Sequence, residues 1–195
     1  TKETASTDEI GGDDVVVVMD DLFRNSSMDI ASNGDIYLAV EKGEVGEPAD
    51  IFIYRSQDGG DTWDSWGNFH STVDQEFREP SLVVAEGIED RCYVAYQHHN
   101  GSGSFEIRLA WSDLSSATGA WYGLTVMSDP TVHYGNPRLV ADDASYSSYY
   151  LYMVAEGYDG GAYDIWFSRS IDRSATWETP YLIADMTLST RKYWE

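Results

Sequence analysis

The chain has 195 residues, of which 42% are hydrophobic and 14% aromatic, so it has the composition of a folded domain rather than a disordered segment. Its 12 basic and 34 acidic residues give a net charge of −22, which argues against non-specific binding to nucleic acid or to an anionic membrane surface. The single cysteine, Cys92, excludes an internal disulfide and a cysteine-based zinc site. No apolar run approaches the roughly 20 residues of a membrane-spanning helix, so no membrane insertion is expected.

Short β-prone runs follow one another along the chain, and we expect each of them to form a strand. The first four are residues 28–31, 36–41, 50–55 and 66–69. The next eight are residues 82–85, 92–97, 105–111, 125–127, 139–141, 149–155, 163–168 and 181–183. The dipeptide Asn33-Gly34, a strong hairpin signal, separates the first two runs. No window shows sustained helical periodicity, so the sequence predicts an all-β fold.

Two sets of markers repeat along the chain with one period. The first, which we call the box, starts at Ser56, Ser112 and Ser170 and ends at Trp63, Trp121 and Trp177. The box serines are 56 and 58 residues apart, and the box tryptophans 58 and 56. The second, which we call the landmark, contains Arg24, Arg78, Gly135 and Arg191 and keeps step with the box. The repeat unit is therefore about 57 residues long and holds four predicted strands.

Four antiparallel strands in each repeat are typical of a β-propeller blade, whereas a β-sandwich would not explain the repeat. We expect an acidic leader at residues 1–14 and a partial propeller at residues 15–195. Its parts are a closing strand at 15–19, blades at 22–70, 71–128 and 129–184, and the start of a fourth blade at 185–195. A propeller needs at least four blades, and six or seven are expected at this repeat length. Either the rest of the same polypeptide or identical chains must then close the ring, with residues 15–19 joining the last blade.

The boxes resemble those of the Asp-box, or BNR-repeat, proteins, whose best-known members are sialidases and whose box reads Ser-x-Asp-x-Gly-x-Thr-Trp. The first copy matches fully, through Ser56, Asp58, Gly60, Thr62 and Trp63. The third copy matches through Ser170, Asp172, Thr176 and Trp177, with Ser174 in place of the glycine. The middle copy is degenerate and keeps Ser112, Asp113 and Trp121. The resemblance implies a sialidase-like β-propeller with Asp-box turns on its outer rim.

The chemistry of the box is that of a turn between the third and fourth strands of a blade. Asp58 can accept hydrogen bonds from backbone N–H groups two or three residues further on. Gly60 permits a positive φ where the chain reverses, and Trp63 returns to pack against the blade. We therefore interpret the box residues as structural rather than catalytic.

The ligand-binding hypothesis rests on the arginines of the landmark. Phe77-Arg78-Glu79-Pro80 resembles the Phe/Tyr-Arg-Ile-Pro motif of sialidases, whose arginine grips the substrate carboxylate. A guanidinium group suits this task because its planar fork pairs bidentately with a carboxylate. The hypothesis is that Arg24, Arg78 and Arg191 converge near the axis and bind an anionic ligand. The alternative is that each arginine pairs with a local carboxylate such as Glu79.

Other features are less informative. His98 and His99 fall near a turn between strands, and adjacent side chains of an extended chain point apart, so no metal site is predicted. Binding of Ca²⁺ by some of the many carboxylates stays an alternative, although no EF-hand pattern occurs. No other cofactor is expected. Cys92 lies in a predicted strand and is interpreted as a small buried hydrophobic residue. Catalysis is assigned to none of the 14 tyrosines.

These patterns favour a non-catalytic binding or structural module of a secreted or cell-surface protein, with a glycan or another anionic ligand as its partner. An acidic surface poor in lysine suits a secreted protein in salty water. The first alternative is a fragment of a sialidase-like exo-glycosidase. The second is a subunit of a surface layer or an appendage.

Overall fold

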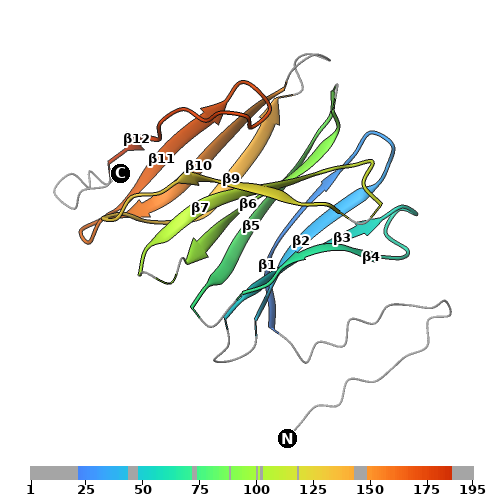
Figure 1. Ribbon diagram of the computed structural model, residues 1–195, viewed down its shortest axis with the longest axis horizontal. Helices are drawn as coiled ribbons and strands as arrows, with labels where there is room; N and C mark the ends of the chain where they lie inside the picture. The colour runs from blue at the N-terminus through green and yellow to red at the C-terminus, as the bar shows by residue number, and fades with distance from the viewer. Residues whose placement is uncertain are drawn as a thin grey trace, which may run out of the picture.

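Three four-stranded antiparallel sheets follow one another along the chain (Figure 1). The computed structural model describes residues 22–43, 48–71, 74–87, 89–99, 101, 103–117, 119–142 and 149–185. The first sheet contains β1 (Leu22–Ile30), β2 (Ile36–Gly43), β3 (Asp50–Ser56) and β4 (Asp64–Phe69). The second contains β5 (Glu76–Ala85), β6 (Arg91–His99), β7 (Phe105–Asp113) and β8 (Tyr122–Met127). The third contains β9 (His133–Asp142), β10 (Tyr150–Tyr158), β11 (Tyr163–Ser170) and β12 (Tyr181–Ala184).

Each sheet is a simple meander, in which strands adjacent in sequence are also adjacent in space. Most or all of each of the twelve β-prone runs lies within one strand, so the predicted all-β repeat is confirmed. We call the sheets the first, second and third blades. No helix in the described part of the chain is long and apolar enough to cross a membrane.

The second blade is packed between the other two, as Figure 1 shows by its place between the blue and the orange sheets. One apolar layer joins the first and second blades through Tyr37, Ile53 and Trp66 on one side and Phe77, Leu82, Val94 and Tyr96 on the other. A second layer joins the second and third blades through Tyr93, Ile107, Leu109, Tyr134, Leu151 and Met153. This explains the unbroken apolar run of residues 92–96 in β6, whose side chains are buried on both faces of the sheet.

The first strands of the three blades, β1, β5 and β9, lie beside one another at the inner edge. Side chains of one blade bond to the backbone of the next along this edge. The Leu82 N–H donates to Ser27 Oγ at 2.8 Å, and the Leu139 N–H donates to Ser81 Oγ at 3.0 Å. The Val84 N–H donates in the same way to a carboxylate oxygen of β1. The inner strands are thus joined by hydrogen bonds that belong to no sheet.

Each inner strand contains a bulge at the landmark, which the sequence did not predict to be part of a strand. The pairing register shifts between Arg24 and Ser27 in β1 and between Arg78 and Ser81 in β5. A similar shift occurs in β9, between its pairings with Glu156 and Val154 of β10. Pairing with the second strand resumes beyond the bulge, so the inner strands begin several residues earlier than predicted.

Two sequence predictions lie outside the described residues. The proposed closing strand, residues 15–19, is one of them. The other is Arg191, together with the rest of the predicted fourth blade beyond residue 185.

Candidate functional site

The first box forms a closed hydrogen-bonded turn between β3 and β4. Asp58 Oδ1 accepts hydrogen bonds from the Thr62 N–H at 2.9 Å and from Ser56 Oγ at 2.8 Å, and Asp58 Oδ2 accepts one from Thr62 Oγ1. Ser56 Oγ accepts the N–H of Gly60, which has a φ of +103°. The backbone donor lies four residues beyond Asp58, not two or three, because Ser56 Oγ takes the nearer N–H. Trp63 closes the turn by donating its indole N–H to the Gly60 carbonyl.

The third box repeats the aspartate and serine bonds of the first without a glycine, whereas its Trp177 packs against the apolar core. Asp172 accepts from the Thr176 N–H at 2.8 Å and from Ser170 Oγ at 2.8 Å. Ser174, which stands at the glycine position, has a φ of +69°, a left-handed conformation that an L-residue adopts at a cost. Its N–H donates to Ser170 Oγ at 2.9 Å.

The middle box forms a different turn. The Asp113 carboxylate lies at the end of β7 and accepts a hydrogen bond from Arg91 Nε at 3.0 Å. The turn is held instead by Ser116, whose N–H donates to the Asp113 carbonyl and whose hydroxyl accepts the Ala120 N–H. The remaining box residues of this copy, Ser112 and Trp121, pack in the interior of the blade and against Trp66 of the first blade.

Hydrogen bonding controls the acidity of the two intact boxes. The bonds from the side chain and backbone of Thr62, and then from Ser56, lower the pKa of Asp58 to about 2. Burial acts to raise the pKa of Asp172, but the hydrogen bonds from Thr176 and Ser170 outweigh it and the pKa is lowered. Both groups are therefore acceptors held in ionised form, which is unsuited to donating a proton in a reaction.

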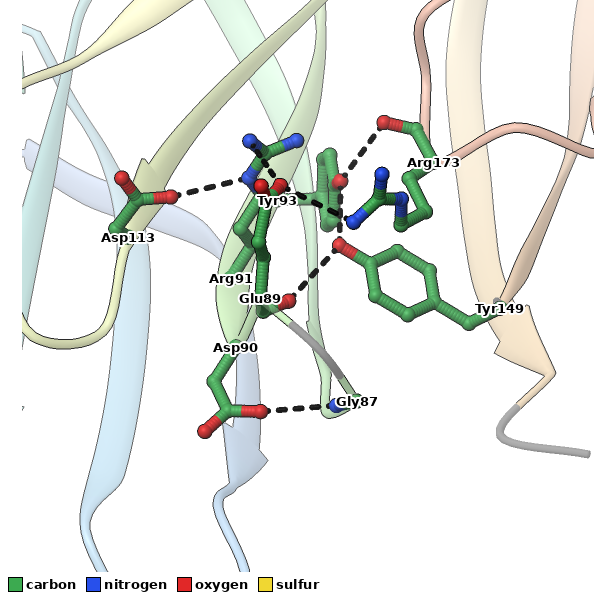
Figure 2. Close-up of polar contacts among 8 residues, drawn as sticks. All are labelled: Gly87, Glu89, Asp90, Arg91, Tyr93, Asp113, Tyr149 and Arg173. Atoms are coloured by element: carbon green, nitrogen blue, oxygen red, sulfur yellow. Dashed lines mark hydrogen bonds and ion pairs between the residues drawn. The ribbon is translucent and has the colours of Figure 1, made fainter. Parts of the chain in front are cut away.

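A polar cluster built on two buried tyrosines joins the second and third blades at the end of the sheets where β6 begins (Figure 2). The hydroxyls of Tyr93 and Tyr149 are 2.8 Å apart. The Tyr93 hydroxyl also contacts the Arg173 carbonyl, and the Tyr149 hydroxyl contacts the Glu89 carbonyl. The Glu89 carboxylate contacts the guanidinium groups of Arg91 at 2.6 Å and Arg173 at 3.3 Å. Burial, together with the hydrogen bond to Tyr93, raises the pKa of Tyr149. Because its groups bond to one another, this cluster has the character of an interblade joint.

The landmark arginines of the described residues pair with carboxylates of their own blades. Arg24 Nε lies 2.6 Å from Glu41 Oε1, and Arg78 Nη2 lies 2.8 Å from Glu76 Oε2. The local partner of Arg78 is thus Glu76 and not Glu79. Neither arginine lines either of the two cavities described next. The anionic-ligand hypothesis stays a prediction, since its third member, Arg191, lies outside the described residues.

Two cavities lie at the landmark. The axial cavity, about 270 Å³, is lined by the inner strands of all three blades, through residues 25–27, 79–81, 136 and 138. The interblade cavity, about 420 Å³, lies between the second and third blades and is lined by Glu79, Gln97, Phe105, His133, Gly135, Asn136, Glu156, Tyr158 and Tyr163. It is at the opposite end of β6 from the tyrosine cluster, because Gln97 lies near the end of that strand and Arg91 at its start. Glu79 and Asn136 belong to both cavities.

A chain of hydrogen bonds positions the acidic groups of the interblade cavity. The Glu79 N–H donates to Glu41 Oε2 at 3.0 Å, and Glu79 Oε2 in turn accepts the Asn136 N–H at 2.6 Å. The Asn136 side-chain amide donates to Glu156 Oε2 at 3.1 Å. Glu79 and Asn136 both have positive φ, at 54° and 49°, which is uncommon outside glycine. Two carboxylates are therefore held on either side of one asparagine.

Aromatic rings form the rest of the wall. On the third blade, Tyr158 and Tyr163 pair across β10 and β11 with ring centroids 5.0 Å apart. Opposite them, Phe105 of the second blade packs against His133 at 5.6 Å and His99 at 4.9 Å. Tyr163 is 62% exposed, so its ring is open to a ligand.

Sequence reasoning missed this site. It considered Glu79 as an ion-pair partner of a landmark arginine, not as a ligand-binding group, and did not select Glu156, Tyr158 or Tyr163. A usable signal was present, since Glu156 occupies the position in β10 that Glu41 occupies in β2, each paired with the landmark residue of its own blade. Cys92 is buried as predicted. Among the described residues, no group of three or more histidine, cysteine or acidic side chains could hold a metal ion.

No protein-family model matches the chain, and no curated protein sequence matches it. Among solved structures, it is similar to an α-L-arabinanase from Penicillium chrysogenum in complex with arabinobiose, with a TM-score of 0.54 and 16% identity. The fold is that of a β-propeller. The match covers 85% of this chain and 50% of the arabinanase, so the chain spans about half the length of that structure. At this identity the likeness extends to the fold, and it confirms the predicted class of four-stranded blades.

Proposed function

We propose that this chain is the part of a β-propeller protein that binds a carbohydrate, and that the ligand occupies the interblade cavity. The observation that carries the proposal is the combination, in one open cavity, of two carboxylates, two side-chain amides and exposed aromatic rings. Aromatic rings stack on the apolar faces of sugars, and carboxylate and amide groups hydrogen-bond their hydroxyls. The structural neighbour, an arabinanase complexed with arabinobiose, supports a sugar as the ligand.

The intact boxes support a place for this chain among the Asp-box proteins. Asp58 and Asp172 each accept a hydrogen bond from the backbone N–H four residues further on and another from the serine hydroxyl two residues earlier. Two separate segments therefore build one turn from one motif, which chance similarity would not produce. A secreted or cell-surface location fits the same proposal and the net charge of −22.

Further blades of the same polypeptide are the proposed neighbours of the first blade. Met28 and Ile30 are 59% and 57% exposed, whereas their counterparts in β5, Leu82 and Val84, are buried against the first blade. An apolar sheet face of this kind needs a covering partner. The measured mass of the natural polypeptide tests this, since a chain of this length alone would require identical copies instead.

Glycoside hydrolysis is the second candidate function, because the cavity contains a pair of carboxylates and most glycosidases use such a pair. Glu79 and Glu156 are separated by the backbone and side-chain nitrogens of Asn136. Release of reducing sugar by the full-length polypeptide, lost in Glu156→Gln even at a saturating sugar concentration, would establish an enzyme. Binding without turnover would establish a binding module.

The binding proposal is tested by calorimetric titration of the full-length polypeptide with arabinobiose and with other neutral disaccharides. Tyr163→Ala should abolish binding without unfolding the protein, because this ring is largely exposed. Tyr122→Ala is the matched control, since Tyr122 is 58% exposed on β8 and lies outside the cavity lining. Unchanged binding in Tyr163→Ala would contradict the proposed site.

A further inference from the structure

We infer that the interblade cavity selects an uncharged sugar over an acidic one, and that Gly135 is the position that admits the polar groups of the second blade to its floor. The inference rests on the proposed function, because it names the ligand class of the same cavity. It follows from what happens to the landmark in the third blade.

The landmark position is occupied differently in the third blade. Arg24 and Arg78 hold it in the first and second blades, and Gly135 holds it in the third. Each of these residues pairs with the same position of its second strand, which is Glu41, Gln97 or Glu156. Among the three described residues at this position, Gly135 alone lines the interblade cavity, and it carries no side chain and no charge.

The space beside Gly135 is taken by polar groups of the second blade. A Cβ atom at this position would lie 2.7 Å from Gln97 Nε2 and 3.2 Å from Glu79 Oε2. Gln97 Nε2 donates to the Tyr134 carbonyl at 2.9 Å, and Glu79 Oε2 accepts the Asn136 N–H at 2.6 Å. Both groups can therefore reach across the interblade boundary only because residue 135 has no side chain. The glycine forms part of the floor of the cavity by letting an amide and a carboxylate approach it.

The charge of the lining excludes an acidic ligand. Among the lining residues that the structure describes, Glu79 and Glu156 carry carboxylates and none is lysine or arginine. The guanidinium groups of Arg24 and Arg78 are engaged by Glu41 and Glu76 and do not line the cavity. A sugar carboxylate placed here would meet like charges at short range with no bidentate cation to offset them.

The same lining suits a neutral sugar. The rings of Phe105, Tyr158 and Tyr163 offer apolar faces on both walls, and the carboxylates accept hydrogen bonds from sugar hydroxyls. Charge-assisted hydrogen bonds of this type are stronger than those between neutral groups. The carboxylates that repel an acidic sugar are therefore the groups that bind a neutral one.

The test compares two disaccharides that differ only in oxidation at C6, galactobiose and digalacturonate, by calorimetric titration of the full-length polypeptide. We expect galactobiose to bind at least about tenfold more tightly than digalacturonate in low salt. Glu156→Gln removes one charge at constant shape and should tighten digalacturonate binding several-fold. Higher salt should narrow the difference in the unmodified protein, because it screens the repulsion.

Gly135→Ala tests the role of the glycine itself. The added Cβ would displace the Gln97 amide or the Glu79 carboxylate, so galactobiose binding should weaken about tenfold while the thermal melt is retained. Gly161→Ala is the matched control, because its Cβ would make only an ordinary contact of 3.5 Å with Asp159. If Gly135→Ala lowers the melting temperature, the Glu156→Gln comparison still decides the charge selectivity.

The outcomes separate the two proposals. Binding of neither disaccharide nor of any other neutral glycan would overturn the proposed function. Digalacturonate binding equal to or tighter than galactobiose binding, lost in Tyr163→Ala, would overturn the inference and leave the proposed function standing. Unchanged galactobiose binding in a folded Gly135→Ala variant would overturn the role of Gly135.

Discussion

Glu79 Oε2 accepts the backbone N–H of Asn136 at 2.6 Å, so a carboxylate at the bulge of one inner strand holds the bulge of the next. The N–H of Glu79 is held in the same way by Glu41 of the first blade. Glu79 therefore has two roles, as a link between blades and as part of the floor of the interblade cavity. A change in how these blades pack would move a group of the proposed binding site.

Removal of the Asp58 carboxylate should destabilise the protein more than the same change at Asp113. Asp58→Ala leaves the Thr62 N–H without its acceptor and breaks the bond from Ser56. Asp113 instead lies at an exposed position and contacts Arg91. Thermal melts of the two variants measure the difference. Equal losses in melting temperature would show that the first box is no more important than the degenerate one.

The stabilising effect of Asp58 should disappear in acid. The pKa of Asp58 is about 2 in the folded protein, below the value near 3.9 of an unfolded chain. A lowered folded-state pKa contributes stability that is fully present above the unfolded-state pKa and is lost as the pH falls through the folded-state value. The melting-temperature gap between the unmodified protein and Asp58→Asn should therefore be largest near pH 6 and shrink from about pH 4 toward pH 2. A constant gap would contradict the assignment of Asp58 as an ionised acceptor.

Tyr149→Phe should lower the free energy of unfolding by about 1–3 kcal/mol, because it removes the bond between the two hydroxyls and the contact of Tyr149 with the Glu89 carbonyl. Urea unfolding measures the change. Tyr150→Phe is the control, since Tyr150 is adjacent and exposed and its hydroxyl should matter little. The prediction fails if the two variants unfold at the same urea concentration.

Ser81→Ala should cost about 1–3 kcal/mol, because it leaves the N–H of Leu139 buried without an acceptor. Ser65→Ala is the matched control, because it removes the same hydroxyl at an exposed position of β4, where water can replace a lost hydrogen bond. Hydrogen exchange at Leu139 gives a local readout, and protection there should fall in the Ser81 variant alone. Retained protection would mean that the bond between inner strands does not hold the third blade.

The strands could be predicted because they depend on local composition. Residues 50–54 alternate half-buried and buried positions, and the Asn33-Gly34 turn has the positive φ of +90° at Gly34 that its sequence requires. The starts of the inner strands could not be predicted. Their first residues include Asn25 and Glu79 at bulges, and these positions become strand only through pairing with β2 and β6.

The interblade cavity was beyond sequence reasoning for a related reason. Glu156 and Tyr158 lie more than 70 residues from Glu79, and only the packing of two blades brings their walls together. The landmark arginines show that a matching residue type does not by itself reveal which group a side chain contacts. Their residue type matched a ligand-binding motif, but Arg24 and Arg78 each find a carboxylate within their own blade.

The hydrogen bonds along the inner edge also make the blades unequal as building blocks. Ser27 and Ser81 each present a hydroxyl to the following blade, whereas the corresponding position of the third blade is Arg138. A chimera that inserts a copy of the second blade after itself retains this acceptor at the new boundary. A chimera that duplicates the third blade places a guanidinium group, which cannot accept, against the incoming backbone N–H. Tandem extension of this protein should therefore cost less stability after the second blade than after the third, and the difference lies in a single side chain.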